Sequence, residues 1–289
     1  MNTLWTFGDS FTAGHGCKFD ASGAFSNSLE TYYKKLYDDY IDVNKKIWPE
    51  IVAHTLGFEL LNYGKNGMTN ESIADSILKH LPSIQKNDIV ILQTSTLGRF
   101  DFPFLKEKTL FGNFSKKYDR DDELFDMSNS PYFFKTIFLS NIEKEYSDDV
   151  KGVLKYSNAQ ESLKNENVIL DKYKYDIIRG FFSEFITTEK YYERSVWRIV
   201  QISNILNLIG IKNYIINETA WPQHLLKQNN LIEMHINGMT GYINNNKKTI
   251  YHKTNGLIDD FHPSYEGHDD IADFIIKFIE NETTNIYNT

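Results

Sequence analysis

Cysteine is almost absent from this sequence of 289 residues, which contains only Cys17. A single cysteine excludes an intramolecular disulfide framework and favours a reducing compartment. A signal peptide is also lacking, because a predicted strand begins by Thr3 and leaves no room for a charged segment followed by an apolar one. We therefore expect a cytoplasmic protein. The alternative is a phage product that is virion-associated or released by lysis, since such a protein needs no signal either.

Long apolar runs and basic clusters are missing as well. No apolar run approaches the roughly 20 residues that span a bilayer, so no membrane partner is expected. The net charge of −8 argues against nucleic acid or an anionic membrane surface as the main partner. Apolar residues make up 41% and charged residues 24%, which is typical of a globular protein. The chain is long enough for one domain with an insertion, and no pattern in it indicates an oligomeric state.

Apolar runs of strand length alternate along the chain with amphipathic segments of helix length. Strands are expected at 3–7, 58–62, 88–93 and 211–216, and helices at 48–57, 70–81, 189–209 and 264–279. Proline in the first turn and glycine at the end mark the first of these helices. Such alternation requires crossover connections and predicts an α/β fold with a mostly parallel sheet between two layers of helices.

The alternation stops between residues 97 and 187, a stretch too long to be a simple loop. We interpret it as an insertion into a single domain of residues 1–289, placed after the third strand and containing helical pieces. It is rich in phenylalanine and tyrosine, which either form a small core of its own or line a substrate cleft. Arg99 lies at its start, where the side chain could bind an anionic group or form a surface ion pair.

Two short fragments, far apart in the chain, together supply serine, aspartate and histidine. Gly8-Asp9-Ser10 follows the first strand directly, so the serine falls where parallel sheets place their reactive groups. The second fragment, at 259–264, contains Asp259 three positions before His262. A serine hydroxyl becomes a good nucleophile when an imidazole takes its proton and a carboxylate orients that imidazole. These residue types therefore indicate nucleophilic catalysis.

In these fragments the chain resembles the GDSL or SGNH hydrolase family, which has a flavodoxin-like three-layer fold. The resemblance implies Ser10 as nucleophile, His262 as general base and Asp259 as its orienting partner, while Asp260 does not fit the family spacing. The fragment at 61–70 resembles the second family block, in which a glycine N–H helps to bind the oxyanion. Gly67 is the matching residue, and Gly64 is the less favoured one.

The third family block differs in this chain. Family members carry Gly-x-Asn after the third strand, and Ser95 stands where the asparagine would be. The expected oxyanion hole therefore comprises the N–H groups of Ser10 and Gly67 and the Ser95 hydroxyl. If the register differs by a residue, the third donor is instead one of Gln93, Thr94 and Thr96.

The function implied is that of an esterase acting on a small-molecule or glycan ester, with an O-acetylated or short-chain acyl carbohydrate favoured. Two alternatives remain: an O-acyltransferase with the same triad, and a weakly catalytic binding or virion-structural protein. Asp9 and Arg99 are candidates for substrate contacts. No cofactor and no metal are expected, because the spacing of His262, His268 and the nearby aspartates matches no metal motif. His15 is either a substrate contact or a solvated loop residue.

Overall fold

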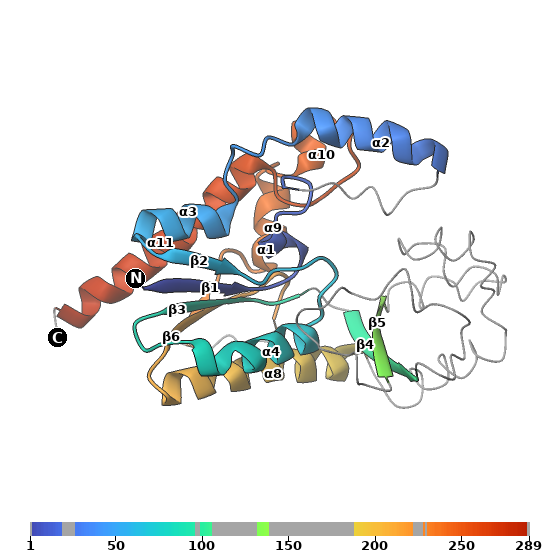
Figure 1. The fold of residues 1–289 in the computed structure, drawn as a ribbon. Helices are drawn as coiled ribbons and strands as arrows, with labels where there is room; N and C mark the ends of the chain where they lie inside the picture. Colours follow the sequence, from blue (N-terminus) through green and yellow to red (C-terminus); the bar gives the residue numbers. More distant parts are fainter. Residues whose placement is uncertain are drawn as a thin grey trace.

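The computed structural model describes residues 2–18, 27–95, 99–105, 132–138, 188–221, 228 and 230–287. Within this part, a five-stranded sheet lies between two layers of helices (Figure 1). The strands are β1 (Thr3–Phe7), β2 (Glu59–Asn62), β3 (Ile89–Gln93), β6 (Lys212–Ile216) and β7 (Leu231–Ile232). No helix among these residues is both long and apolar enough to cross a membrane.

All neighbouring strands of this sheet pair in parallel, in the order β2-β1-β3-β6-β7. Once β4 and β5 are set aside, because they form a separate sheet, this is the flavodoxin-like order 2-1-3-4-5. The predicted α/β fold with a parallel central sheet is confirmed. Because the strands are parallel, their carboxyl ends meet at one edge, where ligand sites of such sheets form.

Helices cover both faces of the sheet (Figure 1). On one face lie α3 (Trp48–Leu56), α9 (Gly238–Asn245) and α11 (Tyr265–Tyr287). On the other face lie α4 (Asn70–His80), followed by a 3₁₀ turn (Leu81–Ser83), and α8 (Thr188–Leu208). The short α1 (Ser10–Ala13), α2 (Asn27–Tyr40) and α10 (Ile250–Lys253) complete the described helices.

The strands supply both cores because successive side chains of a strand point to opposite faces. Val90 and Leu92 pack with α4 and α8, whereas Ile89 and Ile91 pack with α3, α9 and α11. Burying each such side chain contributes about 1.5–3 kcal/mol. A third, smaller cluster, which includes Cys17 and Tyr37, lies beside the loop that carries His262.

The predicted element ends agree with the structure to within a few residues, except that α11 extends past the predicted end at 279. Gly57 ends α3 in the left-handed conformation, with φ 71°, as its position predicted. Among the described elements, α1, α2, α9, α10 and the two-residue β7 were not predicted. These elements are short or lack a clean apolar period, so packing against the rest of the chain determines them.

Of the predicted insertion at 97–187, the structure describes two strands. β4 (Arg99–Leu105) and β5 (Tyr132–Phe138) pair in an antiparallel two-stranded sheet. The expected helical pieces and the aromatic cleft lie outside the described residues.

Candidate active site

Ser10 follows the carboxyl end of β1 and is the first residue of α1. The carboxylate of Asp9 caps this helix by accepting the N–H of Phe11 at 3.1 Å. Gln93, the last residue of β3, accepts the Asp9 N–H at 3.1 Å and the Thr12 hydroxyl at 2.7 Å through its side-chain oxygen. The side chain at the end of β3 thus fixes the turn that carries Ser10.

The loop that carries His262 connects α10 to α11 and is fixed by backbone hydrogen bonds. The N–H of Ile250 donates to the carbonyl of His262 at 3.0 Å, and the N–H of Tyr251 donates to that of Asp260 at 2.7 Å. The His262 ring packs 5.0 Å from the ring of Phe11, measured between centroids. The backbone of this loop is therefore anchored to α10, and the His262 ring packs against α1.

Ser10 and His262 are brought together across 252 positions of the chain. The Ser10 Oγ lies 2.8 Å from Nε2 of His262, and Nδ1 of the same ring lies 2.6 Å from Oδ1 of Asp260. Since Nδ1–H donates to the carboxylate, Nε2 is the nitrogen that accepts the serine proton. Ser10, His262 and Asp260 form a continuous hydrogen-bonded chain.

The expectation that Asp259 orients His262 is wrong in this geometry. Asp259 is exposed, whereas Asp260 is 5% exposed and faces the imidazole. Asp260 Oδ1 also accepts the backbone N–H of His262 at 2.8 Å, which closes an Asx-turn. This turn links a carboxylate to the residue two positions later, so the partner is not the one three positions before the histidine.

The Asp260 carboxylate has donors on both oxygens. Its Oδ2 accepts the Tyr37 hydroxyl at 2.6 Å and lies 3.7 Å from Nε2 of His15. Burial alone raises the pKa of the Asp260 carboxyl. The hydrogen bond from His262, the charges of His262 and His15 and the Tyr37 hydrogen bond outweigh burial, and the pKa falls to about 2. Asp260 is therefore ionised at neutral pH.

Ser95 and Asp9 are both turned away from the predicted tasks. Ser95 is fully buried, and its hydroxyl donates to Oδ2 of Asp9 at 3.1 Å. Because a hydroxyl has one proton, this geometry leaves none for an oxyanion. The buried Asp9 carboxylate caps α1 and accepts from Ser95, so it holds the Ser10 turn rather than a substrate.

The other candidates for the third donor are placed similarly. Gln93 and Thr94 are fully buried: the Gln93 amide donates to the carbonyl of Thr94, and the Thr94 hydroxyl donates to the carbonyl of Ile216. Thr96 lies outside the described residues. Among Gln93, Thr94 and Ser95, none presents its side chain at the surface beside Ser10.

The two glycines of the fragment at 61–70 have different roles. Gly64 packs against α1, where an added Cβ would lie 2.6 Å from the backbone nitrogen of Ala13. Its N–H donates to the Asn62 side chain at 2.9 Å. Gly67 instead has φ 71° and open space where a Cβ would be. The geometry thus favours Gly67 over Gly64 as the glycine with an accessible backbone.

Two histidines near the site are buried. His15, expected either in solvent or against substrate, is 8% exposed, and its ring lies 4.3 Å from that of His262 between centroids. His268 lies in α11 and is fully buried. Burial lowers the pKa of His268 to about 3, with smaller contributions from the charges of His262 and Lys18, so this ring is neutral.

The donor set of His15, Asp260 and His262 is of a kind that zinc accepts. One ligand atom from each lies within 4.8 Å of the others among the described residues. Two ligand atoms of one zinc ion, each about 2.0–2.2 Å from it, lie more than 3 Å apart in a tetrahedral site. The 2.6 Å separation between His262 Nδ1 and Asp260 Oδ1 is too short for this and is that of a charge-assisted hydrogen bond.

Tyr37 and Asn66 lie in the site although no sequence pattern predicted them there. Tyr37, from α2, is buried with its hydroxyl on Asp260, and the Asn66 amide lies 2.7 Å from Nδ1 of His15. No sequence signal distinguishes Tyr37 among 18 tyrosines, although the position of Asn66 beside Gly67 could have singled it out. The side chain of Arg99 lies outside the described residues.

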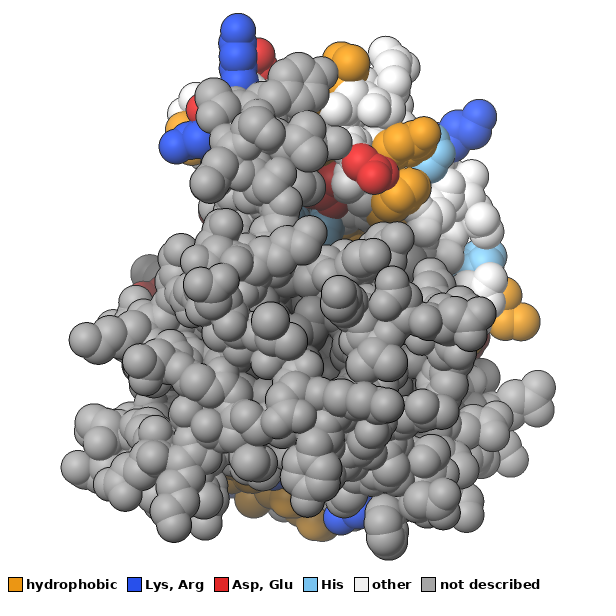
Figure 2. Space-filling model, turned by 90° about the vertical axis from the view of Figure 1, so that its right-hand side faces the viewer, with side chains coloured by type: hydrophobic (Ala, Val, Ile, Leu, Met, Phe, Trp, Pro, Cys, Tyr) orange, Lys and Arg blue, Asp and Glu red, His pale blue; other side chains and the backbone are white. Residues whose placement is uncertain are grey.

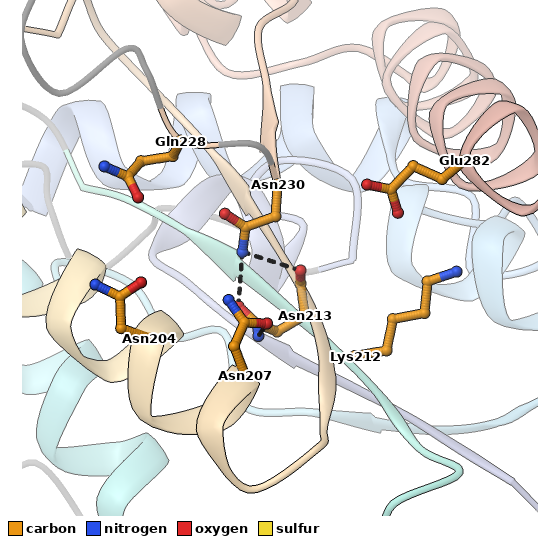
Figure 3. Close-up of a pocket in the computed structure, with 7 residues that line it drawn as sticks. All are labelled: Asn204, Asn207, Lys212, Asn213, Gln228, Asn230 and Glu282. Atoms are coloured by element: carbon orange, nitrogen blue, oxygen red, sulfur yellow. Dashed lines mark hydrogen bonds between the residues drawn. The ribbon is translucent and has the colours of Figure 1, made fainter. Parts of the chain in front are cut away.

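Two parts of the described surface are candidates for a ligand site: the side at the carboxyl ends of the strands and a separate pocket. Figure 2 shows the side at the carboxyl ends of the strands, where acidic, histidine and apolar side chains of described residues lie together. The pocket, about 340 Å³, lies at the amino end of β6 (Figure 3). There Asn213 donates to Asn207 at 2.7 Å and accepts from Asn230 at 2.9 Å. These amides satisfy one another, so the first surface is the better candidate.

Comparison with known proteins finds one distant structural similarity, and the fold described above rests on the strand topology itself. No protein family and no curated protein matches the chain. A solved structure of a protein assigned to the lipolytic G-D-S-L family, from Desulfitobacterium hafniense DCB-2, is similar over 96% of this chain and 99% of that one. The two are 9% identical, with a TM-score of 0.30. At this level the similarity carries no argument about function, which has to come from the site itself.

Proposed function

We propose that this protein is a serine hydrolase that cleaves acyl esters. The observation that carries the proposal is the chain of two hydrogen bonds from Ser10 Oγ to His262 Nε2 and from His262 Nδ1 to Asp260. The nucleophile, a base in contact with it and a buried ionised carboxylate behind the base are what activation of a serine hydroxyl requires.

The residues of the site act at successive steps of the proposed reaction. Ser10 Oγ attacks the ester carbonyl while His262 Nε2 takes its proton, and Asp260 stabilises the imidazolium that forms. The backbone N–H groups of Ser10 and Gly67 donate to the oxyanion. His262 then returns the proton to the leaving alcohol, and a water molecule, deprotonated by the same nitrogen, releases the acid from Ser10.

The substrate class that we propose is a short-chain acyl ester, with an O-acetylated carbohydrate favoured. Support for it comes from the resemblance of the fragments around Ser10 and His262 to GDSL hydrolases. An acceptor alcohol that excludes water would convert the same sequence of steps into acyl transfer.

The test compares wild type with Ser10→Ala, and with Ser83→Ala as the control, because Ser83 is an exposed serine of the 3₁₀ turn. Hydrolysis of p-nitrophenyl acetate should fall at least 10³-fold in Ser10→Ala and stay unchanged in Ser83→Ala. Acetate release from a panel of acetylated sugars then tests the substrate class. Equal rates in wild type and Ser10→Ala would contradict the proposal.

A further inference from the structure

His15 lies against Ser10, His262 and Asp260, and its ring also reaches Asn66, the neighbour of Gly67. Its backbone N–H donates to the carbonyl of Ser10 at 3.0 Å, and its ring packs on that of His262. One ring nitrogen lies 2.7 Å from the amide of Asn66, and the other lies 3.7 Å from Asp260 Oδ2. His15 is therefore a buried imidazole with a polar neighbour at each ring nitrogen and with the His262 ring against its face.

The hydrogen bonds determine which ring nitrogen of His15 carries the proton. The Asn66 amide nitrogen can only donate, so Nδ1 of His15 accepts and the proton resides on Nε2. Nε2–H therefore faces the Asp260 carboxylate, which already accepts from His262 and Tyr37. His15 therefore accepts a hydrogen bond from Asn66 at Nδ1 and directs its Nε2–H toward Asp260.

The chain around His15 is built to hold this position. Gly16, directly after it, approaches Asp260 so closely that an added Cβ would lie 3.0 Å from Oδ2 and 2.2 Å from the end of the Ile250 side chain. Its φ of 76° turns the chain sharply beneath the carboxylate. The imidazole thus sits on a backbone packed against the residue that it faces.

We propose that His15 is a positioning residue that links the turn of Asn66 and Gly67 to the Asp260–His262 pair. This rests on the function proposed above, in which the Gly67 N–H binds the oxyanion and Asp260 orients the base. A hydrogen bond from the Met68 N–H to the carbonyl of Lys65, at 3.4 Å, closes the turn that contains Asn66 and Gly67, and the Asn66 side chain ties this turn to His15. Oxyanion donor and base then keep their mutual distance without reorganisation during the reaction.

Three substitutions separate the two contacts. His15→Asn keeps a polar atom near the position of Nδ1, so it can retain the contact with Asn66. His15→Gln places its amide near the position of Nε2, so it can retain the contact with Asp260. Phe keeps the ring packing against His262 and loses both contacts. His54→Gln is the matched control, because His54 is exposed on α3.

The experiment measures kcat and KM for p-nitrophenyl acetate, together with melting temperature by circular dichroism. We expect His15→Phe to lower kcat by about 10²-fold, the cost of displacing a catalytic group by about 1 Å, with KM within about twofold. His15→Asn and His15→Gln should each recover part of this loss, and His54→Gln should match wild type. A kcat within threefold of wild type in a folded His15→Phe overturns the proposal. If His15→Phe does not fold, wild-type kcat in both other variants overturns it equally.

A second measurement keeps this proposal separate from the proposed function. Conformational exchange of the Gly67 amide, measured by ¹⁵N relaxation dispersion, should increase at least tenfold in His15→Phe and stay near wild type in His15→Asn. If wild type shows no Ser10-dependent turnover, the hydrolase proposal fails, and the Gly67 exchange still decides whether His15 holds the turn. Unchanged exchange in all variants overturns the positioning role.

Discussion

Asp260 Oδ1 lies 2.6 Å from Nδ1 of His262 and 2.8 Å from the backbone nitrogen of the same residue. One carboxylate oxygen therefore fixes both the loop and the ring that the loop carries. The neighbouring Asp259 is exposed and takes no part in this contact. The position of the carboxylate, two residues before the histidine, is a departure from the Asp-x-x-His spacing of GDSL hydrolases.

The first prediction distinguishes the two adjacent aspartates. Asp260→Asn should lower kcat by about 10³–10⁴-fold, because an amide in this place no longer stabilises the imidazolium or selects the right tautomer. Asp259→Asn should change kcat less than about twofold. Steady-state hydrolysis of p-nitrophenyl acetate by both variants measures this. A large loss of kcat in Asp259→Asn, together with an active Asp260→Asn, would contradict this prediction and would make Asp259 the carboxylate that orients His262.

The second prediction concerns Gly67, for which Gly57 is a matched control. Both have φ 71° and open space where a Cβ would be, so alanine at either position brings the same backbone strain, about 1 kcal/mol. Gly67→Ala should also lower kcat, because the backbone relieves the strain by shifting the N–H of residue 67 away from the oxyanion. The loss should approach the roughly 10²–10³-fold that removal of one oxyanion donor costs. Gly57→Ala, at the end of α3, should keep the wild-type kcat.

Urea unfolding of the two alanine variants checks that their stabilities are matched. Equal kcat values in both would show that the Gly67 N–H does not act on the oxyanion.

The third prediction follows from the burial of Ser95. Ser95→Ala removes a hydrogen bond to the Asp9 carboxylate, which should cost about 1.5–3 kcal/mol of unfolding free energy. Its kcat should fall less than tenfold, well short of the loss expected for a direct oxyanion donor. Ser83→Ala, at an exposed position, should change neither quantity. A loss of 10²-fold or more in kcat at unchanged stability would mean that the Ser95 hydroxyl reaches the substrate after all.

The fourth prediction is a pH dependence of stability. The pKa of Asp260 falls from 3.8 to about 2 on folding, so its contribution to stability is complete above pH 4 and is lost as the pH falls through 2. A shift of this size corresponds to roughly 2 kcal/mol. The difference in unfolding free energy between wild type and Asp260→Asn should therefore shrink between pH 4 and 2, which urea titrations at several pH values would show. A difference that stays constant over this range would contradict the assignment.

Much of the site's location follows from chain-local patterns. The run before Gly8 predicts a strand, and a residue that follows a parallel strand lies at the edge where the other strands also end. This placed Ser10, whereas His262 was predicted from the fragment at 259–264, which supplies aspartate and histidine, and from its resemblance to GDSL hydrolases. Periodicity and chain order are properties of neighbouring residues, so they can be read without knowledge of distant contacts.

The choice among neighbouring polar residues required the tertiary structure. Asp259 and Asp260 are chemically identical in the sequence, and only the Asx-turn and the hydrogen bond from Tyr37 select Asp260. Likewise, nothing local shows that the Ser95 hydroxyl points to Asp9, or that His15 packs on His262. The α/β class, the parallel pairing of the main strands and the positions of Ser10 and His262 next to strand and helix ends could thus be predicted from the sequence alone, whereas the strand order came from the structure. The contact of Asp260 with His262, the burial of the Ser95 hydroxyl on Asp9 and the packing of His15 depend on which side chains face inward, and contacts between distant segments decide that.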